Sequence, residues 1–305
     1  MATMRSYQIT EFGGSVSQVI QDIPEPTGTE ALVRVTHAGV CHSDLHIADG
    51  YYDMGGESRM TLGDRGIKLP HTMCHEVLGT LVKAGPDAGD VPVGASRLVH
   101  PWIGCMECSE CQRGRENHCI KAQSIGVFRA GGYAKYALVP HPKFLVDADG
   151  IDPVITSPYA CSGVTVYSAI KKALPVGDNE WLVIMGCGGL GFVAVSIAKA
   201  LGVKNVVACD MDDAKLDAAK QGGASGTVNL KASNAQEKLR EITSGGPRAV
   251  VDTVGAETAF SFGIASLVKG GRYVIVGLFG GELRVPLPTL PLRAISILGS
   301  YTGNL

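Results

Sequence analysis

Hydrophobic and polar positions change their pattern about halfway along the chain. Up to about residue 150, short β-rich runs are separated by Pro and Gly, and Val33 and Val35 fall on one face of such a run. Beyond that point, continuous apolar runs alternate with stretches of helical periodicity, as in parallel strands connected by helices. The pattern predicts an antiparallel, barrel-like domain over residues 1–155 and a doubly wound α/β domain with a parallel sheet over residues 156–305.

Several elements can be given ranges. In the first part, strands are predicted over Ala31 to His37, Val77 to Val82 and Gly132 to Val139. In the second part, the predicted strands are Trp181 to Met185, Val206 to Cys209, Ala249 to Thr253, Tyr273 to Val276 and Ile295 to Leu298, and the predicted helices are Ala214 to Gln221, Gln236 to Thr243 and about Glu257 to Val268. Tyr51 to Lys68 lacks periodicity and predicts a long surface loop.

The segment 157–172 begins like a helix. Ser157 suits an N-cap and Pro158 suits the first helical position. In such a helix Cys161 and Thr165 are four residues apart, so we expect them to share one face.

A glycine-rich turn follows the apolar run that starts at Trp181. This run predicts a strand buried on both faces, and it leads through Gly186-Cys187-Gly188-Gly189-Leu190-Gly191 into a helix. In this order Gly186 allows a tight turn, Gly188 lets the backbone approach a pyrophosphate, and Gly191 allows close packing of helix and strand. The stretch predicts a dinucleotide site at the N-terminus of the helix.

An acidic residue stands where such a site needs one. Asp210 ends the next predicted strand, nineteen residues after Gly191 (210 − 191 = 19), where a carboxylate accepts ribose hydroxyls and repels a 2′-phosphate. This favours NAD over NADP, the alternative being an ordinary βαβ unit with a loop aspartate. Because ligands bind at the carboxyl ends of such strands, Val254 and the turn Val276-Gly277-Leu278 are expected to border the cofactor.

Composition narrows the classes of function. The 305 residues include 27 Lys and Arg, 29 Asp and Glu, and 45% hydrophobic residues, with a net charge of −2. The sequence has no basic tract, so nucleic acid is not an expected partner. Its N-terminus lacks a signal-peptide pattern, and no apolar run approaches the ~20 residues of a membrane span. We therefore expect a cytoplasmic globular protein that does not bind membranes.

Nine cysteines suggest metal ligands, nucleophiles or buried thiols, because an odd number cannot all pair and a reducing compartment disfavours disulfides. Four of them form the series Cys105-x2-Cys108-x2-Cys111-x7-Cys119. Four such thiolates suit a closed, tetrahedral, structural zinc site, with disulfides or inert thiols as the alternatives. The lobe around them, about 104–120, is expected to have little core without the metal.

Two further stretches contain reactive side chains. They are Cys41-His42-Ser43-Asp44-Leu45-His46 and, before a predicted strand, Cys74-His75-Glu76. Taken alone, the first is typical of a polar turn, and His75 of an ordinary structural histidine. The residue types by themselves do not decide between these interpretations and a functional site.

Several motifs in one order resemble the zinc-dependent medium-chain alcohol dehydrogenases. They are CHSDLH at Cys41, HEVLG at His75, the four-cysteine lobe, CSGVT at Cys161, and GCGGLG followed by Asp210. The resemblance covers essentially the whole chain and implies a GroES-like antiparallel barrel as catalytic domain, joined to a Rossmann domain. The segments DGYYDMGG, DRGIKLP, HPWIGC and PYACSGVT resemble the bacterial branch typified by 6-hydroxyhexanoate dehydrogenase.

The resemblance implies two zinc ions per subunit, one catalytic and one structural. Cys41, His75 and Cys161 would hold the catalytic zinc, with water, substrate or transiently Glu76 in the fourth position. Asp44 would be the carboxylate that orients His75. Ser43 and His46 match the family's proton relay.

The same resemblance implies contacts to the cofactor and the substrate. Thr165 would lie against the nicotinamide, Lys215 would help to hold the adenosine ribose, and His42 takes a position close to the cofactor phosphates in many relatives. From their positions relative to His46 and the zinc lobe, Tyr52 and Trp102 are expected in the wall of the substrate pocket. Cys74 replaces a common glycine and is interpreted as a buried inert thiol, with an oxidation site or a minor competing ligand as alternatives.

The implied activity is the reversible, NAD-dependent oxidation of primary or ω-hydroxylated aliphatic alcohols to aldehydes by zinc-assisted hydride transfer. The alternatives are a broad aromatic or secondary alcohol dehydrogenase on the same scaffold, and a non-catalytic protein that binds zinc and NAD. A homodimer or homotetramer is expected, because the edge strand near Ile295 to Ser300 commonly pairs between subunits in this family. Members also usually continue beyond the position of Leu305 with a tail that returns to the catalytic domain.

Overall fold

The computed structural model describes residues 2–305, which divide into two compact units. The first unit comprises Met60–Cys161, the preceding residues up to Tyr52, and Gly303–Leu305, and the second comprises Ser162–Thr302 with Asp53–Arg59. Each unit encloses two hydrophobic clusters of its own. None of the helices within residues 2–305 has the length and apolar character that crossing a lipid bilayer requires.

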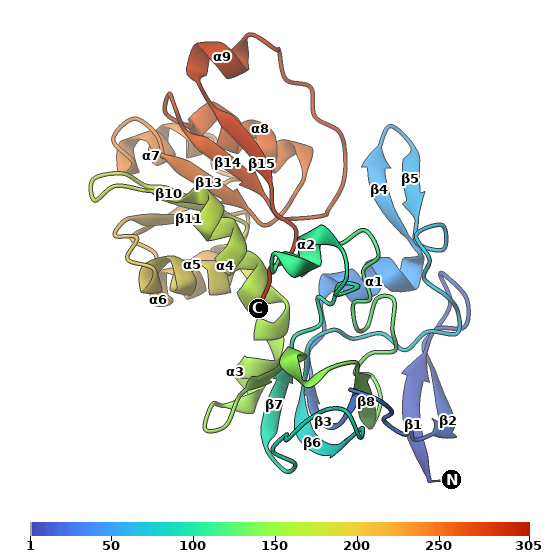
Figure 1. Ribbon diagram of the computed structural model, residues 1–305. Coiled ribbons are helices and arrows are strands. Elements are labelled where there is room, and N and C mark those ends of the chain that lie inside the picture. Colours follow the sequence, from blue (N-terminus) through green and yellow to red (C-terminus); the bar gives the residue numbers. More distant parts are fainter. Residues whose placement is uncertain (1) are drawn as a thin grey trace. The chain divides into compact units, whose positions relative to one another are not determined.

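The first unit consists of short strands and short helical turns. Five strands form an antiparallel sheet in the order β8-β3-β6-β7-β9, and β1 pairs with β2. Figure 1 shows these strands in the blue and green parts of the chain. The elements up to Cys161 are β1 (Thr3–Gln8), β2 (Ser17–Asp22), β3 (Ala31–Ala38), α1 (His42–Asp49), β4 (Tyr51–Gly55), β5 (Ser58–Thr61), β6 (Val77–Ala84), β7 (Ser96–Val99), α2 (Ser109–Gln112), η1 (Glu116–His118), β8 (Tyr136–Val139), η2 (Pro142–Phe144), β9 (Leu145–Asp147), α3 (Pro153–Thr156) and η3 (Ser157–Ala160).

The inner face of this antiparallel sheet carries the core of the first unit. Val33, Val77, Val99, Val139 and Phe144 are all fully buried in one cluster. The antiparallel pairings of these five strands confirm the antiparallel domain predicted for this part of the chain. The third predicted strand is shorter than expected, since β8 begins only at Tyr136.

The second unit is a six-stranded parallel sheet with helices on both faces. The strand order is β12-β11-β10-β13-β14-β15, the order of a dinucleotide-binding sheet, with every neighbouring pair parallel. Its elements are α4 (Ser162–Ala173), β10 (Leu182–Met185), α5 (Gly189–Ala200), β11 (Val206–Asp210), α6 (Asp213–Gln221), β12 (Gly226–Asn229), α7 (Ala235–Ile242), β13 (Ala249–Asp252), α8 (Glu257–Ser266), β14 (Arg272–Ile275), α9 (Thr289–Arg293) and β15 (Ser296–Gly299).

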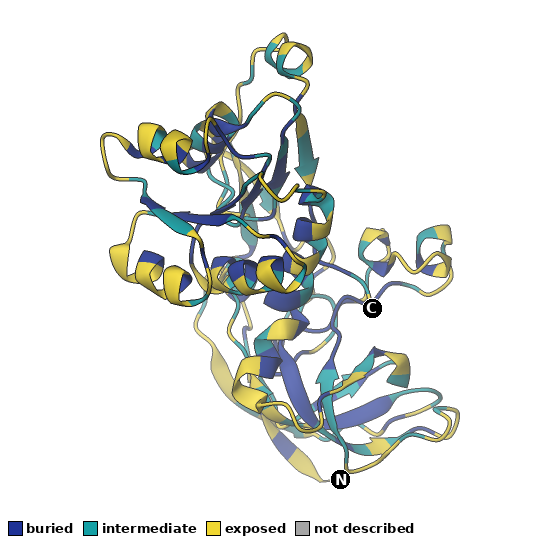
Figure 2. Cartoon of the chain, turned by 90° about the vertical axis from the view of Figure 1, so that its left-hand side faces the viewer, coloured by how far each residue is buried: buried dark blue, intermediate teal, exposed yellow. Residues whose placement is uncertain are grey.

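Successive residues of the central strands face two different cores. Leu182 and Ile184 of β10 lie in the cluster with α4, α5 and α6, whereas Val183 and Met185 lie in the cluster with α7 and α8. This alternation follows from the period of two along a strand. It explains why the strand is continuously apolar, and Figure 2 shows the sheet of this unit as a buried layer between helices with exposed outer faces.

Two sequence predictions about local structure are wrong. The segment predicted as a loop, Tyr51 to Lys68, contains a hairpin of β4 and β5, because Gly55 and Gly56 take the left-handed conformations of a tight turn. The predicted helix at Ser157 begins only at Ser162. Ser157 does not cap a helix, because its hydroxyl donates to the carbonyl of Glu76 instead (2.9 Å).

The late helix start also changes the position of Cys161. This residue follows the 3₁₀ turn η3, which its amide closes by donating to the carbonyl of Pro158 (3.0 Å). Cys161 therefore precedes α4 and does not share a helical face with Thr165.

Candidate active site

Four ligand-type side chains converge in the first unit. Atoms of Cys41, His75, Glu76 and Cys161 all lie within 4.8 Å of one another, although up to 120 positions separate them along the chain. Cys41 ends the loop before α1, His75 and Glu76 precede β6, and Cys161 follows η3. Two thiols, an imidazole and a carboxyl group form a set that suits zinc.

The imidazole of His75 is oriented by a carboxylate and is fully buried. Its Nδ1 lies 3.6 Å from Oδ1 of Asp44. Both ring nitrogens, Nδ1 and Nε2, are buried and have no hydrogen-bond partner among the described residues. An unpartnered buried nitrogen is costly, and a metal ion held by Cys41, Cys161 and Nε2 of His75 would satisfy it.

Asp44 holds the two ligand segments together. The amide of Cys41 donates to Oδ2 (3.0 Å), and the amide of Cys74, which precedes His75, donates to Oδ1 (3.2 Å). Tyr133 donates its hydroxyl to Oδ2 (2.9 Å). Burial raises the pKa of Asp44, but the contacts with His75, Cys41 and Tyr133 outweigh it and lower the pKa. Asp44 is therefore an anion that four groups surround.

The ligands titrate in a way that favours metal binding. Hydrogen bonding with Cys161, followed by contacts with His75, lowers the pKa of the Cys41 thiol to about 4 against the opposing effect of burial. A thiolate is the form that binds a metal. Burial raises the pKa of Glu76 to about 7, with the negative charge at Cys41 as the next cause. Around neutral pH, Glu76 is therefore present in both protonation states.

The predicted pocket residue Trp102 lies beside the cluster. Its ring centroid is 5.3 Å from that of His75, and its Nε1 donates to the carbonyl of Ala160 (3.1 Å). Trp102 is 5% exposed, so a buried aromatic ring packs beside the ligands.

The predicted relay residues lie on α1. Ser43 and His46 are three positions apart and so lie on the same side of the helix. Burial, and next the nearby His42, lower the pKa of His46 below its ordinary value. The ring of His46 contacts those of His42 (5.1 Å) and Tyr52 (4.8 Å). His46 is therefore largely neutral at neutral pH and able to accept a proton.

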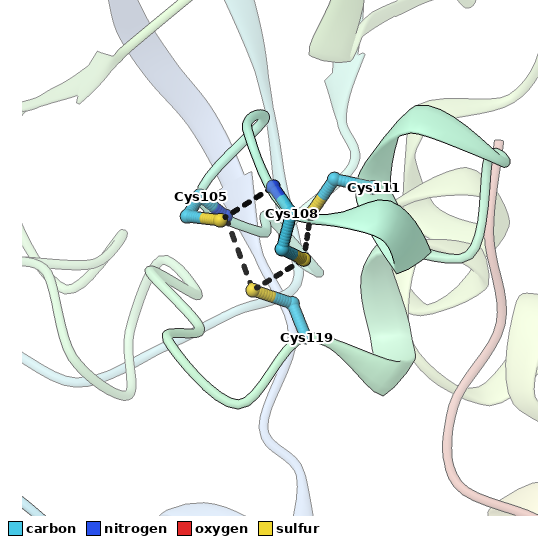
Figure 3. A group of neighbouring side chains, drawn as sticks. All are labelled: Cys105, Cys108, Cys111 and Cys119. Atoms are coloured by element: carbon cyan, nitrogen blue, oxygen red, sulfur yellow. Dashed lines mark hydrogen bonds between the residues drawn. The ribbon is translucent and has the colours of Figure 1, made fainter.

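A second cluster consists of the four cysteines of the lobe (Figure 3), whose sulfur atoms lie within 4.8 Å of one another. Cys108 Sγ is 3.5 Å from Cys111 Sγ and 3.8 Å from Cys119 Sγ. Amides of Glu107 and Cys108 donate to Cys105 and lower its pKa to about 6. The donors form a closed set of four thiols, as a structural zinc site requires.

The lobe has few other means of support. Its one α-helix, α2, has four residues, and Met106 and Ile120 are exposed. It is attached to the rest of the first unit by Lys143, whose Nζ lies 3.4 Å from Oε1 of Glu116, and by Asn304, whose Oδ1 accepts from the amide of Asn117 (3.0 Å).

Because the lobe lacks a core, replacing Cys119 by serine is expected to remove one zinc ion per subunit and to unfold this region locally. Trypsin should then cleave after Arg113, Arg115 or Lys121 under conditions that leave the unmodified protein intact. Metal analysis and mass spectrometry of the fragments measure both effects. Ser109→Ala, an exposed substitution in the same lobe, is the control. Unchanged zinc content and unchanged cleavage in Cys119→Ser would contradict a structural metal here.

The glycine-rich turn of the second unit has the shape of a dinucleotide site. Gly188 precedes α5, and a Cβ added at Gly188 or Gly189 meets no atom within 4 Å, so open space adjoins the helix N-terminus. By contrast, a Cβ on Gly191 would lie 1.8 Å from the carbonyl oxygen of Gly186. Asp210 accepts from the amide of Cys187 (2.7 Å) and so stands at this turn.

Most of the other predicted cofactor residues lie at the carboxyl ends of strands or on helices of the same unit, whereas His42 is the first residue of α1 in the first unit. Val254 follows β13, and Val276, Gly277 and Leu278 follow β14. Lys215 is exposed on α6. Thr165 is buried on α4, and its Oγ1 has no hydrogen-bond partner among the described residues.

Sequence reasoning missed two residues at this edge. The buried carboxylate of Asp252 accepts from the amides of Val254 (2.8 Å) and Gly255 (3.0 Å), and Thr253 donates its hydroxyl to the carbonyl of Met185 (2.9 Å). Both residues fix the turn after β13. Asp252 ends a buried apolar run as Asp210 does, and this signal was present in the sequence.

Comparison with known proteins identifies the family. Residues 27–149 match the alcohol dehydrogenase GroES-like domain, and residues 189–304 match the zinc-binding dehydrogenase domain. An NAD-dependent alcohol dehydrogenase of Sulfurisphaera tokodaii is 36% identical over 303 residues, which is 99% of this chain and 86% of that protein.

Two solved structures share the fold. The alcohol dehydrogenase of Aeropyrum pernix superimposes with a TM-score of 0.88 at 28% identity, over 98% of this chain and 86% of that one. The D-arabinose dehydrogenase of Sulfolobus solfataricus gives the same score and identity over 100% and 90%. The predicted combination of a GroES-like and a Rossmann domain is thus confirmed. Together with the two metal-ligand clusters, these similarities establish that the chain belongs to the zinc-dependent medium-chain alcohol dehydrogenases and is an NAD-dependent oxidoreductase.

Proposed function

We propose that this enzyme oxidises primary or ω-hydroxylated aliphatic alcohols to aldehydes and catalyses the reverse reduction. The observation that carries the proposal is the convergence of Cys41, His75 and Cys161 beside the buried ring of Trp102. A buried aromatic ring beside the ligands suits an unbranched alkyl chain. The sequence segments HPWIGC and PYACSGVT, which contain Trp102 and Cys161, resemble the branch typified by 6-hydroxyhexanoate dehydrogenase and support the same substrate class.

In this proposal Cys41, His75 and Cys161 hold the catalytic zinc, with Glu76 close enough to be a transient fourth ligand. Zinc bound there would supply Lewis-acid chemistry that makes an alcohol easier to deprotonate. Asp44 faces Nδ1 of His75 at 3.6 Å, so Nε2, on the other side of the ring, would be the nitrogen that binds the metal. The four cysteines of the lobe hold the second zinc, and their closed donor set gives it a structural role.

The proton of the alcohol is expected to leave by way of α1. Ser43 passes it to His46, whose lowered pKa leaves the imidazole free to accept it. NAD held in the second unit would supply the hydride acceptor. The amides at the start of α5 would face its phosphates, and Asp210 would accept from its adenosine ribose. His42, Lys215 and Thr165 are proposed as further cofactor contacts.

A substrate panel tests the proposed class. We expect kcat/KM for 1-hexanol and 6-hydroxyhexanoate to exceed that for 2-butanol and benzyl alcohol by roughly 10-fold or more, the discrimination that a shaped apolar pocket provides. Initial rates of NADH formation at 340 nm measure it. Equal or higher values for benzyl alcohol or 2-butanol would instead favour a broad aromatic or secondary alcohol dehydrogenase. If zinc and NAD bind but no alcohol is oxidised, the chain is a binding protein.

We further propose that two copies pair through β15. Its partner in the sheet is β14, and Ser296–Gly299 otherwise ends the sheet as an edge strand. Leu287 and Leu292, which lie just before this strand in the sequence, are strongly exposed, and an unpaired edge of this kind favours association. Light scattering at several concentrations distinguishes monomer, dimer and tetramer.

A further inference from the structure

A tyrosine far from the metal ligands in sequence contacts the carboxylate behind them. Tyr133 Oη lies 2.9 Å from Oδ2 of Asp44 and 3.3 Å from the carbonyl oxygen of Gly39. A phenol has one proton to donate, and the anionic Asp44 is both the nearer and the stronger acceptor. Burial, and next the charge of Asp44, raise the pKa of Tyr133, so it stays protonated and remains a donor.

The backbone around Tyr133 is fixed against the segment that carries His75. Amides of Gly131, Gly132 and Tyr133 donate to carbonyls of Thr72 (2.7 Å), Cys74 (2.9 Å) and Met73 (3.2 Å), respectively. This close approach requires glycine, because a Cβ on Gly131 would lie 2.2 Å from the carbonyl oxygen of Cys74. The Tyr133 ring also packs against both hydrophobic clusters of the first unit. The position of its hydroxyl is therefore set independently of Asp44.

Asp44 lies at the centre of the contacts that orient the ligands. One oxygen, Oδ1, faces Nδ1 of His75 and the amide of Cys74. The other, Oδ2, accepts from the amide of Cys41 and from Tyr133. Without the hydroxyl, Oδ2 keeps the Cys41 amide, and the carboxylate, which is 4% exposed, loses a hydrogen-bond donor in a site that is almost closed to water.

We propose that Tyr133 is a positioning residue for the catalytic metal: by holding Asp44, it fixes the Nδ1 side of His75 and the amide of Cys41, and so the ligand set. This inference rests on the proposed assignment of Cys41, His75 and Cys161 as ligands. It adds a residue that touches neither metal nor substrate and acts through a carboxylate. Loss of the Tyr133 hydroxyl should first change how tightly the metal is held and how it is coordinated. A slower oxidation of alcohol should follow only from that change.

The test measures the rate of zinc release from the holoenzyme. Wild type, Tyr133→Phe and the control Tyr136→Phe are treated with excess chelator, and released zinc is followed by a chromogenic indicator. We expect Tyr133→Phe to release the catalytic zinc ~10-fold faster than wild type. This is the lower end of the range seen when residues that support a metal ligand are substituted. Release from the lobe should be unchanged in all three proteins. Tyr136 is the matched control because it is also a tyrosine, lies three positions away at the start of β8, and is not among the hydrogen-bond donors to Asp44.

Two further measurements separate positioning from a general loss of stability. With Co²⁺ in the catalytic site, the visible absorption bands should shift in Tyr133→Phe and stay unchanged in Tyr136→Phe. In an Asp44→Asn background, adding Tyr133→Phe should accelerate zinc release no further, because the hydroxyl acts through the carboxylate.

Three results would overturn the inference. They are release from Tyr133→Phe within twofold of wild type, an unchanged cobalt spectrum, and additive effects with Asp44→Asn. A wild-type protein that holds zinc only in the lobe would refute the proposed ligand set itself, and the two failures are therefore distinguishable.

Discussion

Replacement of Cys161 by alanine is expected to lower the zinc content from two ions to one per subunit and to abolish alcohol-dependent NAD reduction. Cys161 supplies one of the two thiols that converge with His75, with its Sγ 3.9 Å from that of Cys41. Removing a metal ligand is expected to lower activity more than removing a residue that only contacts a ligand. Alcohol oxidation should therefore fall by more than about 100-fold. Metal analysis and NADH formation at 340 nm measure the two effects.

The control for this variant is Cys209→Ala. Cys209 is fully buried in β11 and belongs to neither metal-ligand cluster, so its loss removes a thiol without removing a ligand. It should keep both zinc ions and wild-type activity. A Cys161→Ala protein that retains two zinc ions would contradict the proposed ligand set, whatever its activity.

The second large effect is expected from alanine at Gly191. The new Cβ would lie 1.8 Å from the carbonyl oxygen of Gly186, and the obstacle is backbone that cannot rotate away. Strand and helix must then separate, which is expected to lower the free energy of unfolding by about 3 kcal/mol and to prevent NAD binding. Chemical denaturation and fluorescence titration with NADH measure the two quantities.

Alanine at Gly188 is the matched comparison, since its Cβ meets no protein atom within 4 Å. The free energy of unfolding of this variant should lie within about 1 kcal/mol of the wild-type value. It should nevertheless bind NADH at least about 10-fold more weakly, because the methyl group occupies space next to the pyrophosphate. The dinucleotide interpretation of this turn would be wrong if Gly188→Ala bound NADH as wild type does.

Much of the fold was predictable because the burial pattern of each strand is local information. The run from Trp181 to Met185 is apolar throughout since its residues face two cores in alternation, and this pattern indicates a doubly wound sheet without any tertiary knowledge. The start of α4 was not predictable in this way. The best capping residue of that segment, Ser157, is used for a tertiary hydrogen bond to Glu76 instead.

The candidate site was predictable in unequal parts. The cysteines of the lobe are close in sequence, so their spacing alone indicates a metal. Cys41, His75 and Cys161 are brought together by the tertiary fold, and only resemblance to a family connected them. Tyr133 had no signal at all, because a hydroxyl that contacts a carboxylate 89 positions away leaves no local pattern.

The contacts of Asp44 also bear on how the protein acquires its metals. The amide of Cys41 donates to Asp44, and Nδ1 of His75 faces the same carboxylate, whereas the lobe has one four-residue α-helix and the 3₁₀ turn η1. We therefore expect the lobe to take up zinc as the chain folds and to keep it for the lifetime of the molecule. We expect the site around Asp44, whose contacts do not include a metal, to accept zinc after folding and to exchange it more readily than the lobe does.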